Sequence, residues 1–451
     1  MTRTSLGPQT GEWISPKMSP SPVELKAADS SAIREHPNEP ASSRRSEGGE
    51  RLAYLDWLRF LVVLSLAPFH AALSYTGFGV VFVYDDPVRD AVLAGHGLYG
   101  RFGPPELRLF TVFMDNWFMH LLFLVAGIGA ALSLRKRTKR AFVGERAERL
   151  LLPLLVITVV LIPVQAWFRA LDFRTFTGGF FAFYPHFFNA LSTGPGGRGN
   201  FEWAHLWFLA YLFVYSVISL PFLERWKRSG SPTALALKAV RVGWLLLPAL
   251  WIGMLEAVFR PGWPGFQNLV NDWANFTVYL SFFLFGYLAG ADPRLQEAAE
   301  HHRLAALALG LLAFCLRLAC YDLLPVGPGY QPFNILAQFL RGVAAWGLVV
   351  AAIGFGRRYL NQTGRILGVA RDLSFPLYLL HFAPLTAVTY FLLGSPLGVW
   401  PRWAISVVVS WAAVALCTYA FRYCRPLRSF FGIRAPSGWA SYRSETSSSE
   451  R

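Results

Sequence analysis

Long apolar runs, each separated from the next by a polar stretch, occupy most of the chain after residue 56. A helix that crosses a bilayer needs about twenty mostly apolar residues. By this measure the pattern predicts ten spans, at about 57–76, 110–134, 149–168, 205–224, 241–259, 273–291, 303–321, 334–355, 374–393 and 403–423. The chain is therefore predicted to be an all-α, polytopic integral membrane protein with about ten transmembrane helices. The even number of spans places both termini on one side.

The lysines and arginines between the spans indicate which side that is. Most of them lie in loops on the same side as the termini, including RKRTKR at 135–140 and RWKR at 225–228. Because basic loops are retained inside, both termini are predicted to be cytoplasmic. Residues 1–50 and 431–451 are rich in polar residues and are expected to be disordered cytoplasmic tails. The transmembrane domain is then expected to span 51–430.

Composition agrees with a membrane protein and excludes other classes. The chain is 54% hydrophobic and 15% charged, where a soluble domain has roughly 25% charged residues. A formal charge of +15 could indicate a nucleic-acid partner, but its basic clusters lie between apolar runs, which favours loops that face an anionic lipid bilayer. We therefore expect no nucleic acid. The four cysteines have neither disulfide nor metal-ligand spacing, so no metal site is expected.

The first span combines charged and titratable residues with an apolar helix. Leu55–His70 reads LDWLRFLVVLSLAPFH. Arg59 and His70 are eleven residues apart, which places them on one stripe of a helix, about 16 Å apart along its axis. Pro68 removes a backbone hydrogen bond just before His70 and permits a kink. Because ionisable groups inside a membrane are usually functional, His70 is a candidate catalytic group. A packing histidine and an Asp56–Arg59 surface ion pair remain the alternative.

Arg146 and Arg149 stand three residues apart in GERAER, at the start of the third span. They suit a phosphate clamp, because guanidinium groups bind phosphate oxygens in pairs. Basic residues are also expected at this boundary for topological reasons alone.

Further polar residues lie in other spans. His120, in the second span, is expected at about the depth of His70, either in the site or in helix packing. His205 and Trp207 are expected at the external surface, where they would form an aromatic belt or bind a sugar. His381 is expected to join helices. Arg317 and Arg341 fall inside spans, with no role assigned.

Four motifs in this order resemble the membrane-bound acyltransferase family 3. They are the first-span segment, LLFLVAG followed by a basic loop and RAERLLLP, HLWFLAYLFVY, and SFPLYLLH. FFAFYPHFF, which precedes the third of these, makes the chain similar to the glucans biosynthesis protein C branch in particular. The resemblance covers roughly 52–425. Ala126 stands where the family usually has a serine before the glycine.

The resemblance implies a function for these residues. In that family the arginine and histidine of the first helix and the Arg-x-x-Arg motif are essential, which here are Arg59, His70, Arg146 and Arg149. The implied reaction moves an acyl group, acetyl or succinyl, from cytoplasmic acyl-CoA to a glycan such as a periplasmic glucan. His205, Trp207 and His120 are the expected acceptor-binding residues, and a bacterial inner membrane is the expected location.

Two questions remain open on sequence alone. His70 could act as a general base on the acceptor hydroxyl or could itself carry the acyl group. The alternative function is a transporter or flippase for a glycan or lipid-linked saccharide, in which the intramembrane His and Arg line a pathway. No repeat relates the two halves of the chain, which counts against a transporter.

Overall fold

The computed structural model describes residues 52–77, 83–94, 102–191, 199–228, 243–265 and 267–434. The expected tail at 1–50 and most of the expected tail at 431–451 lie outside the described residues. The described residues belong to one compact unit. Its regular elements are helical, as predicted.

The helices are named here in chain order. They are α1 (Ala53–Thr76), α2 (Asp86–Leu93), α3 (Pro105–Asp115), α4 (Phe118–Lys136), α5 (Lys139–Arg146), α6 (Leu152–Val160), α7 (Ile162–Asp172), α8 (Phe180–Phe183), α9 (Trp207–Ile218), α10 (Leu220–Arg228), α12 (Gly243–Phe259), α13 (Trp273–Ala291), α14 (Pro293–His301), α15 (Arg303–Leu323), α16 (Pro332–Tyr359), α17 (Arg365–Leu380), α18 (Phe382–Leu393), α19 (Val399–Phe421) and α20 (Arg425–Phe431). A π-helical turn, Ala147–Leu151, joins α5 to α6.

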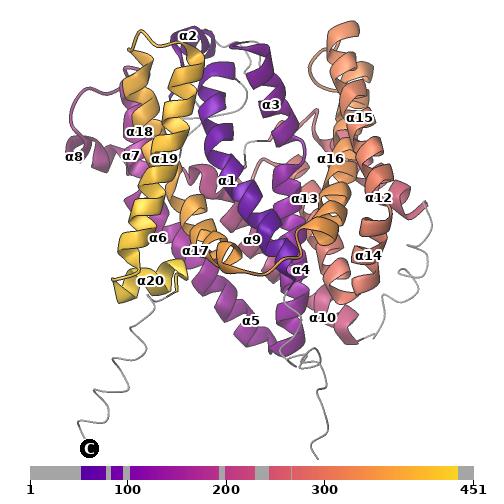
Figure 1. Cartoon of the computed structure of the whole chain (residues 1–451). Coiled ribbons are helices and arrows are strands. Elements are labelled where there is room, and N and C mark those ends of the chain that lie inside the picture. The colour runs from indigo at the N-terminus through magenta and orange to yellow at the C-terminus, as the bar shows by residue number, and fades with distance from the viewer. Residues whose placement is uncertain are drawn as a thin grey trace, which may run out of the picture. The chain divides into compact units, whose positions relative to one another are not determined.

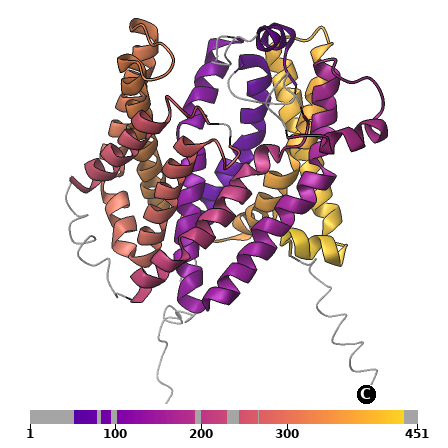
Figure 2. The same cartoon turned by 180° about the vertical axis from the view of Figure 1, so that it is seen from behind.

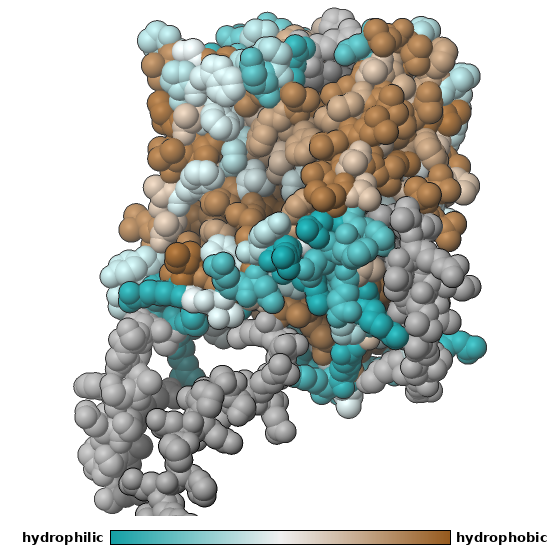
Figure 3. Space-filling view, turned by 45° about the vertical axis from the view of Figure 1, so that its right-hand side comes forward, coloured by the Kyte–Doolittle hydropathy of each residue, from teal (hydrophilic) through white to brown (hydrophobic). Residues whose placement is uncertain are grey.

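The described residues contain six helices that are long and apolar enough to cross a membrane. The number rises to nine if each of three bent pairs counts as one span, and α12 is a shorter apolar helix. Figure 3 shows one face, where apolar side chains cover a broad band and polar side chains gather above and below it. The polytopic architecture is therefore confirmed.

The expectation of continuous spans is wrong at three places. The α5–α6 segment and α7 meet at 41°, α9 and α10 at 52°, and α17 and α18 at 57°. Composition and length do not reveal such breaks, because both halves are apolar. The last of them has a direct consequence for the site.

The basic loops gather at one end of this unit. In Figure 1, α5, α10, α14 and α20 lie at the lower end, whereas α2 lies at the upper end. We call these the basic end and the opposite end. Figure 2 shows the other side, across which the magenta and pink helices of 139–228 slope.

Helix α1 lies inside the bundle and packs against α17 and α19 on one side and against α16 on the other (Figure 1). Pro68 lies inside it and leaves the carbonyl of Leu64 without its usual helical donor. Trp411 of α19 donates its indole N–H to that oxygen at 3.2 Å. Trp403 donates in the same way to the carbonyl of Pro68 at 2.9 Å. Two tryptophans therefore donate hydrogen bonds to backbone carbonyls in the turns that precede His70. In an apolar environment no water would be present to take their place.

Helices α4 and α13 cross with their backbones in close approach. A methyl group at Gly127 would lie 2.0 Å from the carbonyl oxygen of Phe283, and one at Gly286 would lie 2.0 Å from that of Leu124. Such small residues allow helices to pack closely in a membrane, where no hydrophobic force drives helices together. This contact gives a packing reason for Gly127 in the second-span motif.

Candidate functional site

Three histidines from different parts of the chain lie side by side in the bundle. His70 comes from α1, His205 from the 3₁₀ turn before α9, and His381 from the break between α17 and α18. The His381 ring centroid lies 5.2 Å from those of both His70 and His205. Phe382 covers the His70 ring, with centroids 4.5 Å apart. The prediction that His381 joins helices is confirmed, because His70 Nδ1 lies 2.9 Å from His381 Nε2.

The backbone around His381 fixes where its proton lies. Its Nδ1 is 2.7 Å from the carbonyl oxygen of Leu377 and 3.1 Å from that of Tyr378. Carbonyl oxygens only accept hydrogen bonds, so this nitrogen must carry the proton. In the neutral ring, His381 Nε2 is then an acceptor. A charged histidine here would be costly in an apolar interior, which favours the neutral form.

The same reasoning determines which ring nitrogen of His70 carries the proton. Because His381 Nε2 accepts, His70 Nδ1 must be the donor. The lone pair of neutral His70 is consequently on Nε2. His381 therefore orients the His70 ring and selects the tautomer in which Nε2 is free to take a proton.

The break in the last helical pair brings His381 into this position. The segment SFPLYLLHFAP carries Pro376 and Pro384 on either side of the histidine. Proline cannot donate to the carbonyl four residues earlier, which favours a bend. Ser410 of α19 donates to the backbone oxygen of His381 at 2.7 Å and holds the bend.

The structure corrects the predicted surface position of His205 and Trp207. Their side chains are 7% and 6% exposed, respectively, so both are buried. Trp207 packs against Tyr211 and Tyr279, which leaves no open platform for a sugar. The reason is that this span begins with a 3₁₀ turn, Ala204–Leu206, in which His205 and Leu206 are buried. His205 instead adjoins His70, with centroids 6.5 Å apart.

His120 is fully buried between the rings of Tyr279 and Phe282. Neither of its ring nitrogens has a hydrogen-bond partner among the described residues. His120 therefore does not join the three-histidine cluster by any described hydrogen bond.

Arginines gather around the other end of α1, at the basic end. Arg59 is about half exposed and lies 3.4 Å from Asp56, as the ion-pair alternative predicted. Arg371 of α17 also binds Asp56, at 2.6 Å. The sequence analysis assigned no function to Arg371, because the sequence does not show that it lies beside Asp56.

Arg146 ends α5 just before the π-helical turn that joins α5 to α6, and Arg149 lies within this turn. Such turns occur frequently at functional sites. Arg149 is exposed and contacts Glu145 at 3.5 Å, whereas Arg146 lies over the ring of Phe142. The charges of Arg149 and Arg59 both act on Arg146. We call Arg59, Arg146, Arg149 and Arg371 the basic-end cluster.

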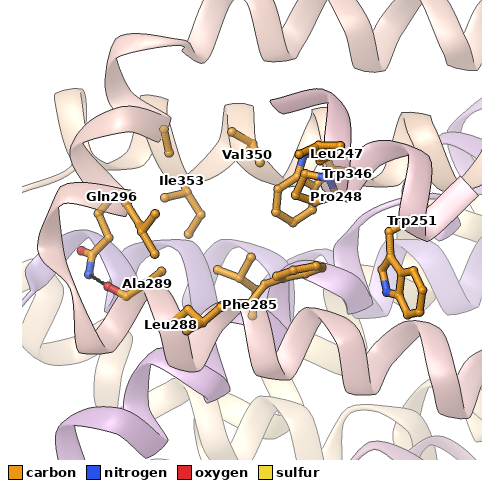
Figure 4. Close-up of a pocket in the computed structure, with 13 residues that line it drawn as sticks. Leu247, Pro248, Trp251, Phe285, Leu288, Ala289, Gln296, Trp346, Val350 and Ile353 are labelled. Atoms are coloured by element: carbon orange, nitrogen blue, oxygen red, sulfur yellow. Dashed lines mark hydrogen bonds between the residues drawn. The ribbon is translucent and has the colours of Figure 1, made fainter. Parts of the chain in front are cut away.

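An apolar pocket lies away from both groups, between α12, α13, α14 and α16. It has a volume of about 320 Å³. Figure 4 shows Trp251, Phe285 and Trp346 among its walls, with Gln296 as a polar residue at one side. It contains no titratable side chain and therefore offers no acid or base for catalysis. Across the described part of the chain, no three His, Cys, Asp or Glu side chains are placed to hold a metal ion.

The site thus combines a histidine of defined tautomer in an apolar interior with arginines at the basic end, an arrangement suited to group transfer within a membrane. Comparison with protein families agrees, since the model of an acyltransferase domain, acyltransferase 3, matches residues 52–422. The chain belongs to the acyltransferase 3 family and is a membrane-bound acyltransferase. No curated protein and no solved structure matched significantly. Family membership decides against the transporter alternative.

The histidine pair predicts how two substitutions of His381 differ. His381→Phe keeps the ring but removes the acceptor for His70 Nδ1–H, so acyl-transfer turnover should fall by roughly 10²-fold, within the range for lost acid–base catalysis. His381→Gln supplies a carbonyl oxygen near the position of Nε2 and should retain much of the activity. The test is kcat and KM in membranes with matched amounts of protein.

The split between kcat and KM separates positioning from a structural role. Loss of positioning lowers kcat and leaves KM for the acyl donor nearly unchanged. Equal activity of the Phe and Gln variants would contradict the role assigned to His381.

Proposed function

We propose that the chain transfers an acyl group from acyl-CoA at the basic end to a hydroxyl group of a glycan that approaches from the opposite end. The observation that carries this proposal is the hydrogen-bonded His70–His381 pair, which leaves His70 Nε2 free as a base inside the membrane. Family membership supplies acyl transfer as the reaction class.

The acyl donor is assigned from charge. Within the described residues, the ion pairs formed by the four guanidinium groups of the basic-end cluster involve two carboxylates, those of Asp56 and Glu145. Coenzyme A carries several phosphate groups, which arginines bind in bidentate fashion. Arg59 and His70 are about 16 Å apart along α1. With its phosphates on the cluster, the pantetheine arm extends along α1 and brings the thioester near His70.

His70 then acts as a general base. Its Nε2 takes the proton of the acceptor hydroxyl while the hydroxyl oxygen attacks the thioester carbonyl. The carbon–sulfur bond breaks, and the CoA thiolate receives the proton from the imidazolium. His381 stays in contact with Nδ1 throughout, so the ring keeps one orientation. We prefer this route to an acyl-histidine. His70 Nδ1 is occupied by its hydrogen bond to His381, so Nε2 would have to carry the acyl group and could not at the same time take the proton of the acceptor hydroxyl.

The finer assignments follow the family resemblance. The acyl group is acetyl or succinyl, and the acceptor is an extracytoplasmic glycan such as a glucan. The basic end then faces the cytoplasm, as the positive-inside rule requires, in a bacterial inner membrane. Arg59 contributes at the basic end, where its half-exposed side chain is available to phosphate.

The first experiment measures release of free CoA thiol from acetyl-CoA and succinyl-CoA, with glucan extract as acceptor. Membranes containing the wild-type chain should release thiol. His70→Ala should reduce release by roughly 10²- to 10⁴-fold, since it removes the base. His301→Ala changes an exposed histidine at the end of α14 and is the matched control. Undiminished release by His70→Ala would refute the assigned base.

A second experiment tests the phosphate clamp. Arg146→Gln and Arg149→Gln should each raise KM for acyl-CoA by about tenfold, because each removes a charge-assisted hydrogen bond to phosphate. Their kcat should change little, since neither contacts the reacting atoms. Arg174→Gln, an exposed arginine after α7, is the control and should leave KM unchanged. A fall in kcat at constant KM would contradict the clamp.

A further inference from the structure

A second group of charged residues lies inside the bundle, between α3, α12, α15 and α16. Arg260 of the segment after α12 forms a two-point contact with Glu256, at 2.7 and 3.0 Å. Arg341 of α16 binds Asp115 at 2.8 Å and lies 3.6 Å from the same Glu256. These four residues pair two positive with two negative charges.

Arg317 of α15 adds a third positive charge, and neither of these two carboxylates pairs with it directly: Asp115 and Glu256 attract Arg317 only from a distance. Its side chain is 6% exposed, and it makes no hydrogen bond or ion pair with the described residues. Its guanidinium lies over the Tyr321 ring, 5.5 Å from the centroid. Its strongest charged neighbour is Arg341, which repels it. A buried cation without a partner is costly, so its retention here indicates a ligand that supplies the negative charge.

Other carboxylates nearby do not fill this role. Asp272, beyond Arg260, is engaged by the hydroxyl of Tyr211 and the side-chain amide of Asn275. Asp322 of α15 is exposed and forms no ion pair with Arg317 in the described structure.

Position along the helices indicates the side from which a ligand arrives. Arg317 lies fourteen residues after Arg303, or about 21 Å along α15 from the basic end. Arg341 lies nine residues after Pro332, or about 13 Å from the opposite end. Both arginines are therefore nearer the opposite end, where the acceptor approaches.

Two polar side chains, those of Asn116 and Trp117, lie at the junction of α3 and α4, which contacts the backbone of Arg341. Asn116, between α3 and α4, donates to the carbonyl of Arg341 at 3.4 Å. Its own side-chain oxygen and the indole nitrogen of Trp117 are buried without partners among the described residues. Phe118 then packs against Phe69, the residue before His70, with centroids 4.8 Å apart. Unsatisfied buried groups of this kind call for a polar ligand or water.

We propose that Arg317, together with Arg341, binds a carboxylate or phosphate group carried by the acceptor. The acceptor is then a glycan that carries an anionic substituent, and this group is anchored at Arg317 while the buried polar groups of Asn116 and Trp117 are available to its hydroxyls. This inference rests on the proposed function for the identity of the ligand, but the anion site itself does not depend on it.

Thermal stability tests the anion site without any assay of activity. The parent is the full chain with Arg146→Gln and Arg149→Gln, so that the basic-end cluster contributes less to anion binding. Inorganic phosphate and succinate should raise the melting temperature of this purified parent above that in chloride at equal ionic strength. Adding Arg317→Gln should weaken binding of either anion by about tenfold or more, as expected for loss of a charged hydrogen-bond donor. Arg317→Lys should keep part of the response.

Melting temperatures without added anion give the decisive contrast. Removing a charge that no carboxylate pairs with directly should leave the melting temperature of Arg317→Gln equal to or above that of its parent. Arg341→Gln, which leaves Asp115 without its partner, should lower it. A melting temperature lowered as much by Arg317→Gln as by Arg341→Gln, with an unchanged anion response, would overturn the proposal.

The source of the anion is decided by turnover in the chain with Arg146 and Arg149 intact. If the acceptor carries the charge, Arg317→Gln should reduce thiol release equally from acetyl-CoA and succinyl-CoA. A loss confined to succinyl-CoA would overturn the assignment to the acceptor, because the charge would then belong to the acyl group. Failure to release thiol at all would refute the proposed function and leave the stability result standing.

Discussion

The hydrogen bond between His70 and His381 is the interaction on which the site depends. It joins α1 to the break between α17 and α18, two segments separated by about three hundred residues of chain. It also gives an otherwise ordinary imidazole a defined orientation and a defined tautomer. Without this contact, the ring of His70 would be free to present either nitrogen, and a base at this depth would be available only part of the time.

The apolar surroundings explain why so many side chains in this region form hydrogen bonds to backbone carbonyl groups. Trp411 donates to the carbonyl of Leu64 that Pro68 leaves without a helical donor, Trp403 donates to the carbonyl of Pro68 itself, and Ser410 holds the bend at His381. In hydrocarbon each such group left alone would cost several kcal/mol. Against this background, the unsatisfied buried groups of Arg317 and Asn116 in the described structure, which lie near one another at Arg341, are candidate places for a ligand.

Sequence alone was sufficient for the class of fold, and it supplied several candidate residues for the site. The apolar runs predicted a helical membrane protein, and the Arg59–His70 stripe and the Arg-x-x-Arg spacing identified residues at two depths. It could not supply the breaks within spans, because both halves of a broken helix are equally apolar. Pro376 and Pro384 on either side of His381 were a usable signal of the last break.

Burial was the least predictable property. Trp207 was assigned to the surface because tryptophan is common at membrane interfaces, yet it packs against tyrosines within the bundle. The proximity of His205 and His381 to His70 likewise could not be predicted from the sequence, because it depends on how helices that are distant in the chain pack together. The role of Arg371 could not be predicted either, because nothing in its local sequence indicates that it pairs with Asp56 of α1, as Arg59 also does.

The most direct measurement of the central claim is nitrogen NMR of the purified full chain labelled with ¹⁵N-histidine. The chain has nine histidines, and the His70 signals are assigned by their loss in His70→Ala. At neutral pH we expect a neutral His70 ring with its proton on Nδ1, hydrogen-bonded to an unprotonated Nε2 of His381. A proton on His70 Nε2 would contradict this expectation, because that nitrogen could not then accept the proton of the acceptor hydroxyl.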